Sequence, residues 1–258
     1  MSDTLHHPWR VAERTWPEVK SAAYTMALLP WGATEAHNTH LPYGTDTMLA
    51  EAAADAAAAE AWTRGVHVAV LPSLAYGVQA GQLDIPFCMN MSPTTQLHAL
   101  RDLAASLVPH NIRALVIINA HGGNDFKPTI RELQPATSLF LATVDWWKAG
   151  DMKATFAEPG DHAGELETSA MQHVAPHLVR PLSEAGDGHS RNWKFLAMQQ
   201  GWAWAPRQWT RISDDTGVGN PAASTAQKGE LYVRACGERI GAFLAELNDA
   251  LPSDLYET

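Results

Sequence analysis

Four side chains that can bind a metal ion or transfer a proton occur within twelve residues, between an apolar segment and an alanine-rich one. They are Glu35, His37, His40 and Asp46. Residues 24–30 are apolar and end at Pro30, which predicts a buried strand, and residues 45–64 predict a helix capped by Thr45. The polar cluster is therefore expected on a strand-to-helix connection, the edge of an open α/β sheet at which ligands usually bind.

The rest of the chain alternates between apolar segments and helical ones. Further strands are expected at 66–71, 114–119 and 138–144, and further helices at 92–110, from 125, and at 224–248. This alternation predicts a mainly parallel sheet between layers of helices. No change in composition marks a linker, so residues 1–258 are expected to form a single domain with a short tail at its end. The tryptophan-rich segment 184–212 is expected to lie across the active face or between subunits.

Composition excludes several classes of function. The net charge of −10 argues against a nucleic-acid-binding protein, which needs positive charge to attract phosphates. The two cysteines, Cys88 and Cys236, form no disulfide framework and suit a reducing compartment. The first ten residues do not resemble a signal peptide, and no apolar run reaches membrane-spanning length. We therefore expect a cytoplasmic protein that binds neither nucleic acids nor membranes.

A second motif, Ala120-His121-Gly-Gly-Asn124, directly follows the most apolar of the expected strands. Its glycines allow a sharp turn and a close approach of the backbone to a ligand. His121 is therefore either a metal ligand or a residue that caps the next helix.

A third group of ionisable side chains precedes the helix expected near residue 173. His162 is a candidate for proton transfer because its ordinary pKa lies near neutrality, and Asp161 is expected to support it. Glu165 and Glu167 can be ligands, bases or carboxylates favoured by the helix dipole.

These residue types point to metal chemistry. Imidazole nitrogens and carboxylate oxygens are the usual ligands of zinc, manganese and iron(II). Glu35, His37, Asp46 and His121 all follow expected strand ends and can therefore converge, unless Asp46 only caps a helix and the histidines are scattered on the surface. Asp46 can bridge two ions, and a water between them would become a hydroxide that attacks a carbonyl group. His162 would then protonate the leaving atom. Motifs of serine hydrolases, Rossmann proteins and P-loop enzymes are missing from the sequence.

Four motifs in order resemble those of the creatininase (creatinine amidohydrolase) superfamily, over residues from about Trp16 to Glu246. They are Leu29-Pro-Trp-Gly-Ala-Thr-Glu35-Ala-His37 with Asp46, Asn119-Ala-His121-Gly-Gly-Asn124, His162-Ala-Gly-Glu-Leu-Glu167-Thr-Ser169, and Ser224-Thr-Ala-Gln-Lys-Gly-Glu230. The resemblance implies a three-layer α/β/α fold of the creatininase type, two divalent metal ions (zinc or manganese, with iron as a further candidate) and a homo-oligomer such as a hexamer.

The resemblance also implies roles for single residues. Glu35, Asp46 and His121 would hold one metal, and His37 and Asp46 the other, with His162 as the proton-transfer residue. Trp146 or Trp147 would line the pocket.

The chain also departs from the family pattern at several places. Gly123 stands where creatininase has a glutamate that completes the second metal site, and Glu167 is the candidate replacement. Asp161 stands where creatininase has a glutamate. The loop 77–91, with Gln82, does not resemble the substrate loop of creatininase.

The leading hypothesis is a two-metal hydrolase that opens a cyclic amide or related C–N bond of a small molecule. Its candidate substrate-binding residues are His40, Gln82, Trp146, Trp147 and Glu165. The alternative is hydrolysis of a C–C bond in a cyclic polyhydroxy ketone such as a keto-inositol, because the 77–91 loop is polar. A further alternative is a metal-binding subunit without catalytic activity.

Overall fold

The computed structural model describes residues 7–250 and 255–256. The expectation about a signal peptide partly concerns residues 1–6, and that about a tail concerns 251–254 and 257–258, which lie outside the described residues. Among the residues described, no helix is both long enough and apolar enough to cross a membrane.

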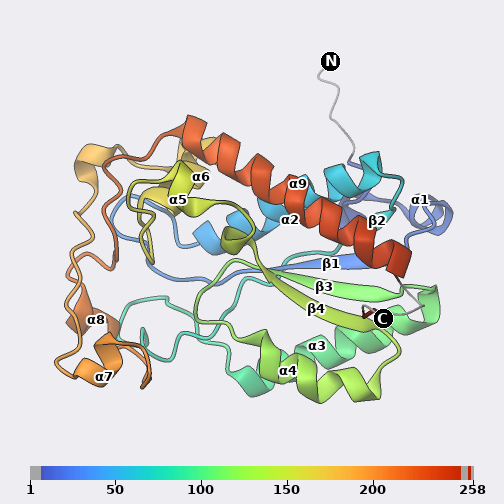
Figure 1. Cartoon of the computed structure of the whole chain (residues 1–258), viewed down its shortest axis with the longest axis horizontal. Coiled ribbons are helices and arrows are strands. Elements are labelled where there is room, and N and C mark those ends of the chain that lie inside the picture. Colours follow the sequence, from blue (N-terminus) through green and yellow to red (C-terminus); the bar gives the residue numbers. More distant parts are fainter. Residues whose placement is uncertain (1–6, 251–254, 257–258) are drawn as a thin grey trace.

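A four-stranded parallel sheet forms the centre of the molecule, with the strand order β2-β1-β3-β4 (Figure 1). The strands are β1 (Met26–Trp31), β2 (Val68–Val70), β3 (Ala114–Asn119) and β4 (Phe140–Asp145). Every residue of the two central strands, β1 and β3, is buried. Helices cover both faces of such a sheet, which explains why these two strands are apolar almost throughout instead of alternating.

Two layers of helices enclose the sheet and create two apolar cores (Figure 1). On one face lie α2 (Thr45–Thr63), α6 (Glu165–Val174) and α9 (Ala226–Ala250), and on the other α3 (Pro93–Leu107) and α4 (Phe126–Leu133). Successive residues of β1 alternate between the cores: Met26 and Leu28 belong to the first, Ala27 and Leu29 to the second. The structure confirms the predicted three-layer α/β/α fold.

The remaining elements are short. They are the helices α1 (Trp16–Ser21), α5 (Met152–Thr155), α7 (Leu196–Gln199) and α8 (Trp209–Ile212), and the 3-10 turns Val11–Glu13, Val108–His110, Gln134–Ala136, Trp146–Lys148, Pro176–Leu178 and Leu182–Glu184.

Some element ends differ from the predictions. The strand expected at 66–71 shortens to Val68–Val70, and the last helix extends to Ala250, into the expected tail. The prediction that Thr45 caps α2 is wrong: Gly44 precedes the helix, and the Thr45 hydroxyl instead donates to the carbonyl oxygen of Pro42 at 2.7 Å. That bond closes the turn in front of α2, so Asp46 lies in the first turn of the helix.

The carboxyl ends of β1, β3 and β4 lie in register at one edge of the sheet. Trp31 pairs with Asn119, which in turn pairs with Asp145. The side chain of Asn119 donates to Asp145 Oδ1 at 2.9 Å and accepts from the backbone N–H of His121 at 3.1 Å. These bonds fix the direction in which the chain leaves β3, and therefore the place of His121.

Helices α2 and α9 pack closely enough to require glycine at the contact. A Cβ atom added at Gly237 would lie 2.5 Å from the Cβ atom of Ala56 and 2.9 Å from its carbonyl carbon. Both distances are shorter than normal van der Waals contacts, so a side chain at residue 237 must push the two helices apart.

We expect Gly237→Ala to lower the free energy of unfolding by about 1–3 kcal/mol, because overpacking outweighs the better helix propensity of alanine. Thermal unfolding followed by circular dichroism measures the effect. The control is Glu238→Ala, at the next, exposed position, where a change within about 0.5 kcal/mol is expected. An unchanged melting temperature in Gly237→Ala would show that the helices are not in contact there.

Candidate active site

Glu35, Asp46 and His121 form the first group of potential metal ligands, at the carboxyl edge of the sheet. Nδ1 of His121 lies 2.8 Å from Oε1 of Glu35 and 3.2 Å from Oδ2 of Asp46. All three residues are buried. The loop after β1 supplies Glu35, the first turn of α2 supplies Asp46, and the glycine turn after β3 supplies His121.

His37, Asp46 and Glu167 form a second group that shares Asp46 with the first. Nε2 of His37 lies 3.0 Å from Oδ1 of Asp46, and Glu167 joins the group from the first turn of α6. Within each group the potential ligand atoms lie within 4.8 Å of one another, as they do in a third set that combines Glu35, His37 and His162. Asp46 therefore turns one carboxylate oxygen toward a histidine of each of the first two groups.

Backbone carbonyl oxygens orient all three histidines. They lie 3.0 Å from Nε2 of His121 (Val78 O), 3.1 Å from Nδ1 of His37 (Glu35 O) and 2.8 Å from Nε2 of His162 (Ala36 O). A carbonyl oxygen can only accept a hydrogen bond, so in each ring this nitrogen carries the hydrogen. The other nitrogen faces the carboxylates, as in metal sites where a carbonyl behind the histidine fixes its ring.

Charge at the cluster shifts the pKa values strongly. Burial alone would lower the pKa of His37, but the Asp46 carboxylate outweighs burial and raises it to about 10. In the same way Glu35 and Asp46 outweigh burial and raise the pKa of His121. Burial would raise the pKa of Asp46, but the two imidazoles hold it well below its usual range. For Glu167 burial prevails and raises the pKa.

The cluster has the properties of a cation site. Three carboxylates face three imidazoles. Oδ2 of Asp46 is buried and makes no hydrogen bond among the described residues, and Nδ1 of His121 is its ion-pair partner at 3.2 Å. Buried carboxylates are unstable unless a positive charge offsets them, so the arrangement is unfavourable without a cation or a proton between the groups. Nitrogen and oxygen donors of this kind suit zinc and manganese.

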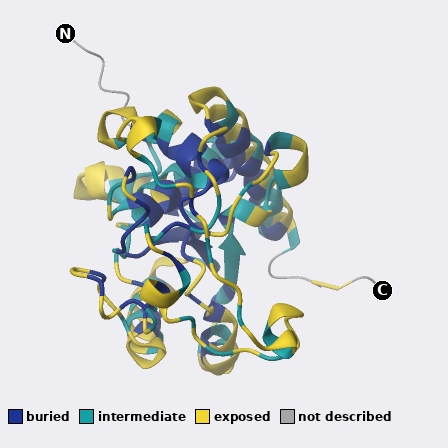
Figure 2. Cartoon of the chain, turned by 90° about the vertical axis from the view of Figure 1, so that its left-hand side faces the viewer, coloured by how far each residue is buried: buried dark blue, intermediate teal, exposed yellow. Residues whose placement is uncertain are grey.

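A cleft of about 420 Å³ opens over the cluster. Its lining includes Glu35, Asp46, His121, His162 and Glu167, the loop residues 78–82, the turn residues Gly122 and Gly123, and residues 204–207 with Trp209. Figure 2 shows the molecule from the side on which α7 and α8 lie in Figure 1. Both short helices belong to the tryptophan-rich segment 184–212. Residues 204–207 and Trp209 supply one wall of the cleft, which agrees with the first of the two positions expected for the tryptophan-rich segment, across the active face or between subunits.

His162 lies between the ligand groups and the wall of the cleft. Its ring packs on that of His37, with 4.2 Å between the centroids, and meets the ring of Trp209 edge-on at 5.2 Å. Its Nδ1 atom lies 3.8 Å from Oε1 of Glu35. Gln82 also reaches the cluster, where its amide donates to Oε2 of Glu35 and accepts from the thiol of Cys88 at 3.3 Å.

Asp161 is not placed to support His162, contrary to expectation. It is exposed at the rim of the cleft, and its carboxylate pairs with Arg207 at 2.6 Å. The ring nitrogens of His162 face Ala36 and Glu35 instead. The two side chains are neighbours in sequence but point to different surroundings.

The two tryptophans after β4 belong to the core, so the expectation that they line the pocket is not met. Trp146 is almost completely buried, and its ring meets that of Tyr232 in α9 with 6.0 Å between the centroids. The backbone carbonyl of Trp147 accepts a hydrogen bond from the Tyr232 hydroxyl at 2.6 Å. Trp147 is half-buried against the same core with Lys148 over its ring, and neither tryptophan belongs to the described lining of the cleft.

Glu165 and His40 are buried beside the cleft and have protein partners. Glu165 pairs with Lys228 of α9; burial would raise its pKa, but the Lys228 partner prevails and lowers it. Nε2 of His40 lies 2.8 Å from the hydroxyl of Thr168, and burial lowers the pKa of His40 to about 4. Both residues are absent from the described lining of the cleft, and Nδ1 of His40 has no hydrogen-bond partner among the described residues.

Gln79 and Arg207 also line the cleft, and the sequence analysis singled out neither of them. The guanidinium of Arg207 lies over the Trp209 ring at 4.5 Å, and the backbone N–H of Trp209 donates to the carbonyl of Gly81 at 2.9 Å. The richness of this segment in tryptophan was the only signal in the sequence.

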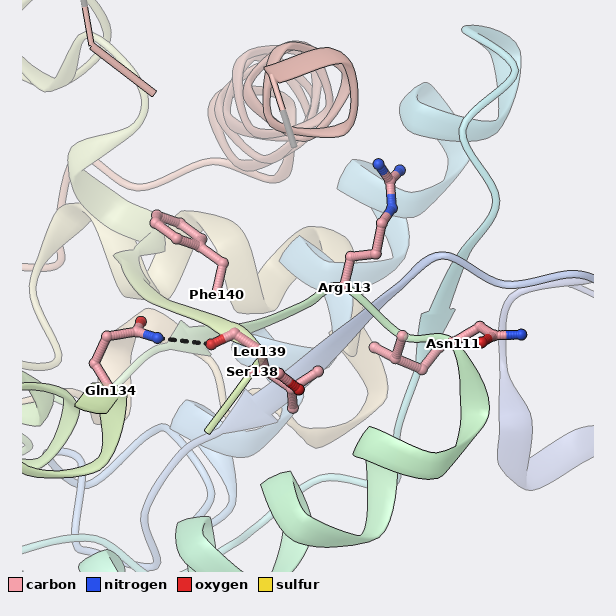
Figure 3. Close-up of a pocket in the computed structure, with 7 residues that line it drawn as sticks. Asn111, Arg113, Gln134, Ser138, Leu139 and Phe140 are labelled. Carbon is pink, nitrogen blue, oxygen red and sulfur yellow. Dashed lines mark hydrogen bonds between the residues drawn. The ribbon is translucent and has the colours of Figure 1, made fainter. Parts of the chain in front are cut away.

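A second hollow lies near the opposite, amino-terminal edge of the sheet (Figure 3). Its volume is about 520 Å³, and it is lined by residues 111–113, Gln134 and 138–140. Arg113 is the one ionisable side chain among its described lining residues, and it donates to the Asn248 carbonyl at 3.1 Å. The ionisable side chains are therefore concentrated in the cleft over the ligand groups.

Comparisons with known proteins agree with this geometry. A family model described as "Creatininase: Creatinine amidohydrolase" matches residues 12–244. The mycofactocin precursor peptide peptidase of Mycolicibacterium smegmatis is 28% identical over 233 residues, which are 88% of either chain. The creatinine amidohydrolase of Pseudomonas putida is 25% identical over 194 residues, 66% of this chain and 73% of the relative.

Solved structures share the same fold. The crystal structure of a Bacteroides fragilis protein described as "Putative creatinine amidohydrolase" has a TM-score of 0.91 and 38% identity, and the match covers 98% of this chain and 100% of the other. A structure described as "Creatininase Mn" has a TM-score of 0.77 and 23% identity, with 93% and 98% of the chains covered.

Metal binding to the metal-free protein is expected to release protons. The raised pKa values of His37, about 10, and of His121 mean that both rings are protonated at pH 7, whereas a metal needs their free nitrogens. Titration calorimetry with zinc chloride, in buffers of different ionisation enthalpy, should report roughly two protons released per chain. Metal affinity should therefore rise as the pH increases from 7 toward the pKa of His37, about 10, because fewer protons then have to be displaced. Binding without proton release would contradict the assignment of these two rings.

Proposed function

The chain belongs to the creatininase family of hydrolases, and on that premise we propose that it uses two divalent metal ions to open a cyclic amide or a related C–N bond. Two of the relatives carry names for the hydrolysis of such bonds, a peptidase and an amidohydrolase. Solved creatininase structures are described with manganese and as a "Zn-Zn type". Zinc or manganese is therefore the proposed cofactor.

One observation carries the proposal: the carboxylate of Asp46 belongs to both ligand groups. Its Oδ1 atom faces His37 at 3.0 Å and its Oδ2 atom faces His121 at 3.2 Å. Glu35, Asp46 and His121 would hold one ion, and His37, Asp46 and Glu167 the other. Bound there, the ions would polarise a carbonyl group and lower the pKa of a water molecule.

Glu167 supplies the carboxylate that Gly123 lacks. A Cβ atom at Gly123 would lie 2.3 Å from the carbonyl oxygen of Val78 and 2.4 Å from Nε2 of His121. The space that a side chain would need is thus taken by the hydrogen bond between Val78 and His121. In this chain the orientation of His121 excludes a glutamate at residue 123, and α6 provides one instead.

His162 is proposed as the proton-transfer residue. Because Nε2 donates to the carbonyl of Ala36, Nδ1 is left as the basic nitrogen, and it faces Glu35. From the wall of the cleft, Nδ1 can take a proton from water and give it to the leaving nitrogen. The contacts with His37 and Trp209 keep the ring in this orientation.

We expect Glu167→Gln to reduce the metal content of the purified, zinc-loaded enzyme from two ions per chain to one, because the second group keeps only His37 and Asp46. Inductively coupled plasma mass spectrometry measures the content. The matched control is Glu158→Gln, an exposed glutamate before the same helix, which should retain both ions. Two ions in Glu167→Gln would remove Glu167 as a ligand.

Turnover tests the reaction class. The zinc- or manganese-loaded enzyme is offered cyclic amides (creatinine, hydantoin, succinimide and glutarimide), linear dipeptide amides, and cyclic polyhydroxy ketones, and mass spectrometry detects the addition of water. We expect turnover in the first panel. His162→Gln should lower kcat by about 10²–10⁴-fold with its metal retained, whereas His189→Ala, an exposed histidine, should not. Turnover of linear amides alone would contradict the cyclic substrate, and turnover of ketones alone would contradict C–N cleavage.

A further inference from the structure

Gln79 is a buried glutamine whose amide has no partner at either end in the part of the chain that the structure describes. The residue is only 3% exposed, and neither Nε2 nor Oε1 has a hydrogen-bond partner among the described residues. The residue lines the cleft that holds the metal-ligand groups. Buried amides are normally paired, because an unpaired donor or acceptor costs about 1–3 kcal/mol.

The backbone around Gln79 is held firmly, so the unpaired side chain is not the result of a loose loop. Its N–H donates to Oδ1 of Asn90 at 2.7 Å, and its carbonyl accepts from the N–H of Gln82 at 3.0 Å. The preceding residue, Val78, orients His121 through its own carbonyl. Gln79 is therefore fixed beside a candidate metal ligand.

Packing does not explain a glutamine at this position. Methionine has nearly the same length and volume and would fill the space without burying two unpaired polar atoms. The nearby Gln82 shows the contrast, since its amide is bound at both ends by Glu35 and Cys88. The amide of Gln79 thus costs stability in the free protein, as groups retained for binding do.

We propose that Gln79 recognises the substrate by pairing with one edge of a cyclic amide, an inference that rests on the proposed function. A carboxamide presents a donor and an acceptor side by side. Its complement is a carbonyl next to an N–H on the same side, as in a small ring, where the amide is cis. A trans amide of a linear peptide presents these two groups on opposite sides and cannot make both bonds. The substrate class is therefore small cyclic amides and imides with a free N–H.

The experiment compares ring substrates with and without that N–H. The metal-loaded wild type and Gln79→Met are assayed with succinimide and glutarimide and with their N-methyl derivatives. A two-bond contact of this kind is worth about 1–3 kcal/mol, which is about 5–150-fold. The wild type should prefer the unmethylated rings by a factor in this range in kcat/KM. Gln79→Met should lose this preference, mainly through a higher KM for the unmethylated rings.

The melting temperature provides a second test of the inference that does not depend on turnover. Replacing an unpaired buried amide removes a cost, so the melting temperature of metal-loaded, substrate-free Gln79→Met should equal or exceed that of the wild type. The matched control is Gln134→Met at the other hollow (Figure 3). Gln134 donates to the carbonyl of Leu139 at 2.7 Å and accepts from the N–H of Leu141 at 2.9 Å. The control should melt at a lower temperature and keep the preference for unmethylated rings.

The outcomes separate this inference from the proposed function. A wild type that turns over no cyclic amide overturns the proposed function and the substrate class together. An active wild type whose preference survives in Gln79→Met overturns only the assignment of Gln79. A melting temperature of Gln79→Met below that of the wild type shows that the amide is paired in the free protein, and this too overturns the assignment.

Discussion

The candidate site depends on the carboxylate of Asp46, which lies between the imidazoles of His37 and His121. Each of its two oxygens faces one of these rings. The negative charge of Asp46, together with that of the neighbouring carboxylates, raises the pKa of both imidazoles. Neither a buried carboxylate nor a buried imidazolium is stable alone, because each pays a large cost of desolvation. The charged groups are therefore stable only together, and a divalent ion can replace the protons that hold them.

A framework of backbone carbonyls makes this arrangement rigid. The carbonyls of Glu35, Ala36 and Val78 each orient one histidine ring, so three ring orientations depend on the path of two loops. Gly123 allows Val78 to approach His121, and the register of β1, β3 and β4 brings these loops to the same edge. The site is thus positioned by the parallel sheet, which explains why apolar strands and polar loops follow each other so regularly in the sequence.

Much of the fold followed from the sequence. The apolar runs at 24–30 and 114–119 predicted buried strands, because strands buried on both faces lack alternation, and β1 and β3 form there. Convergence of the candidate ligands could also be predicted, because parallel strands end at one edge. The surroundings of Trp146 and Glu165 could not be predicted from the sequence. Trp146 packs on Tyr232 and Glu165 pairs with Lys228, and both partners belong to α9, which is far along the chain.

The sequence by itself determined the layered α/β architecture, the edge at which the polar motifs gather and membership of a hydrolase family. These rest on local periodicity and on motif spacing, which neighbouring residues define. Only the tertiary structure decided which polar side chains face the cleft. Gln82 and Gln79 are three residues apart, yet the amide of Gln82 is bound at both ends and that of Gln79 has no partner among the described residues. That difference arises from contacts between segments distant in sequence, since hydrogen-bond partners and burial are set by packing.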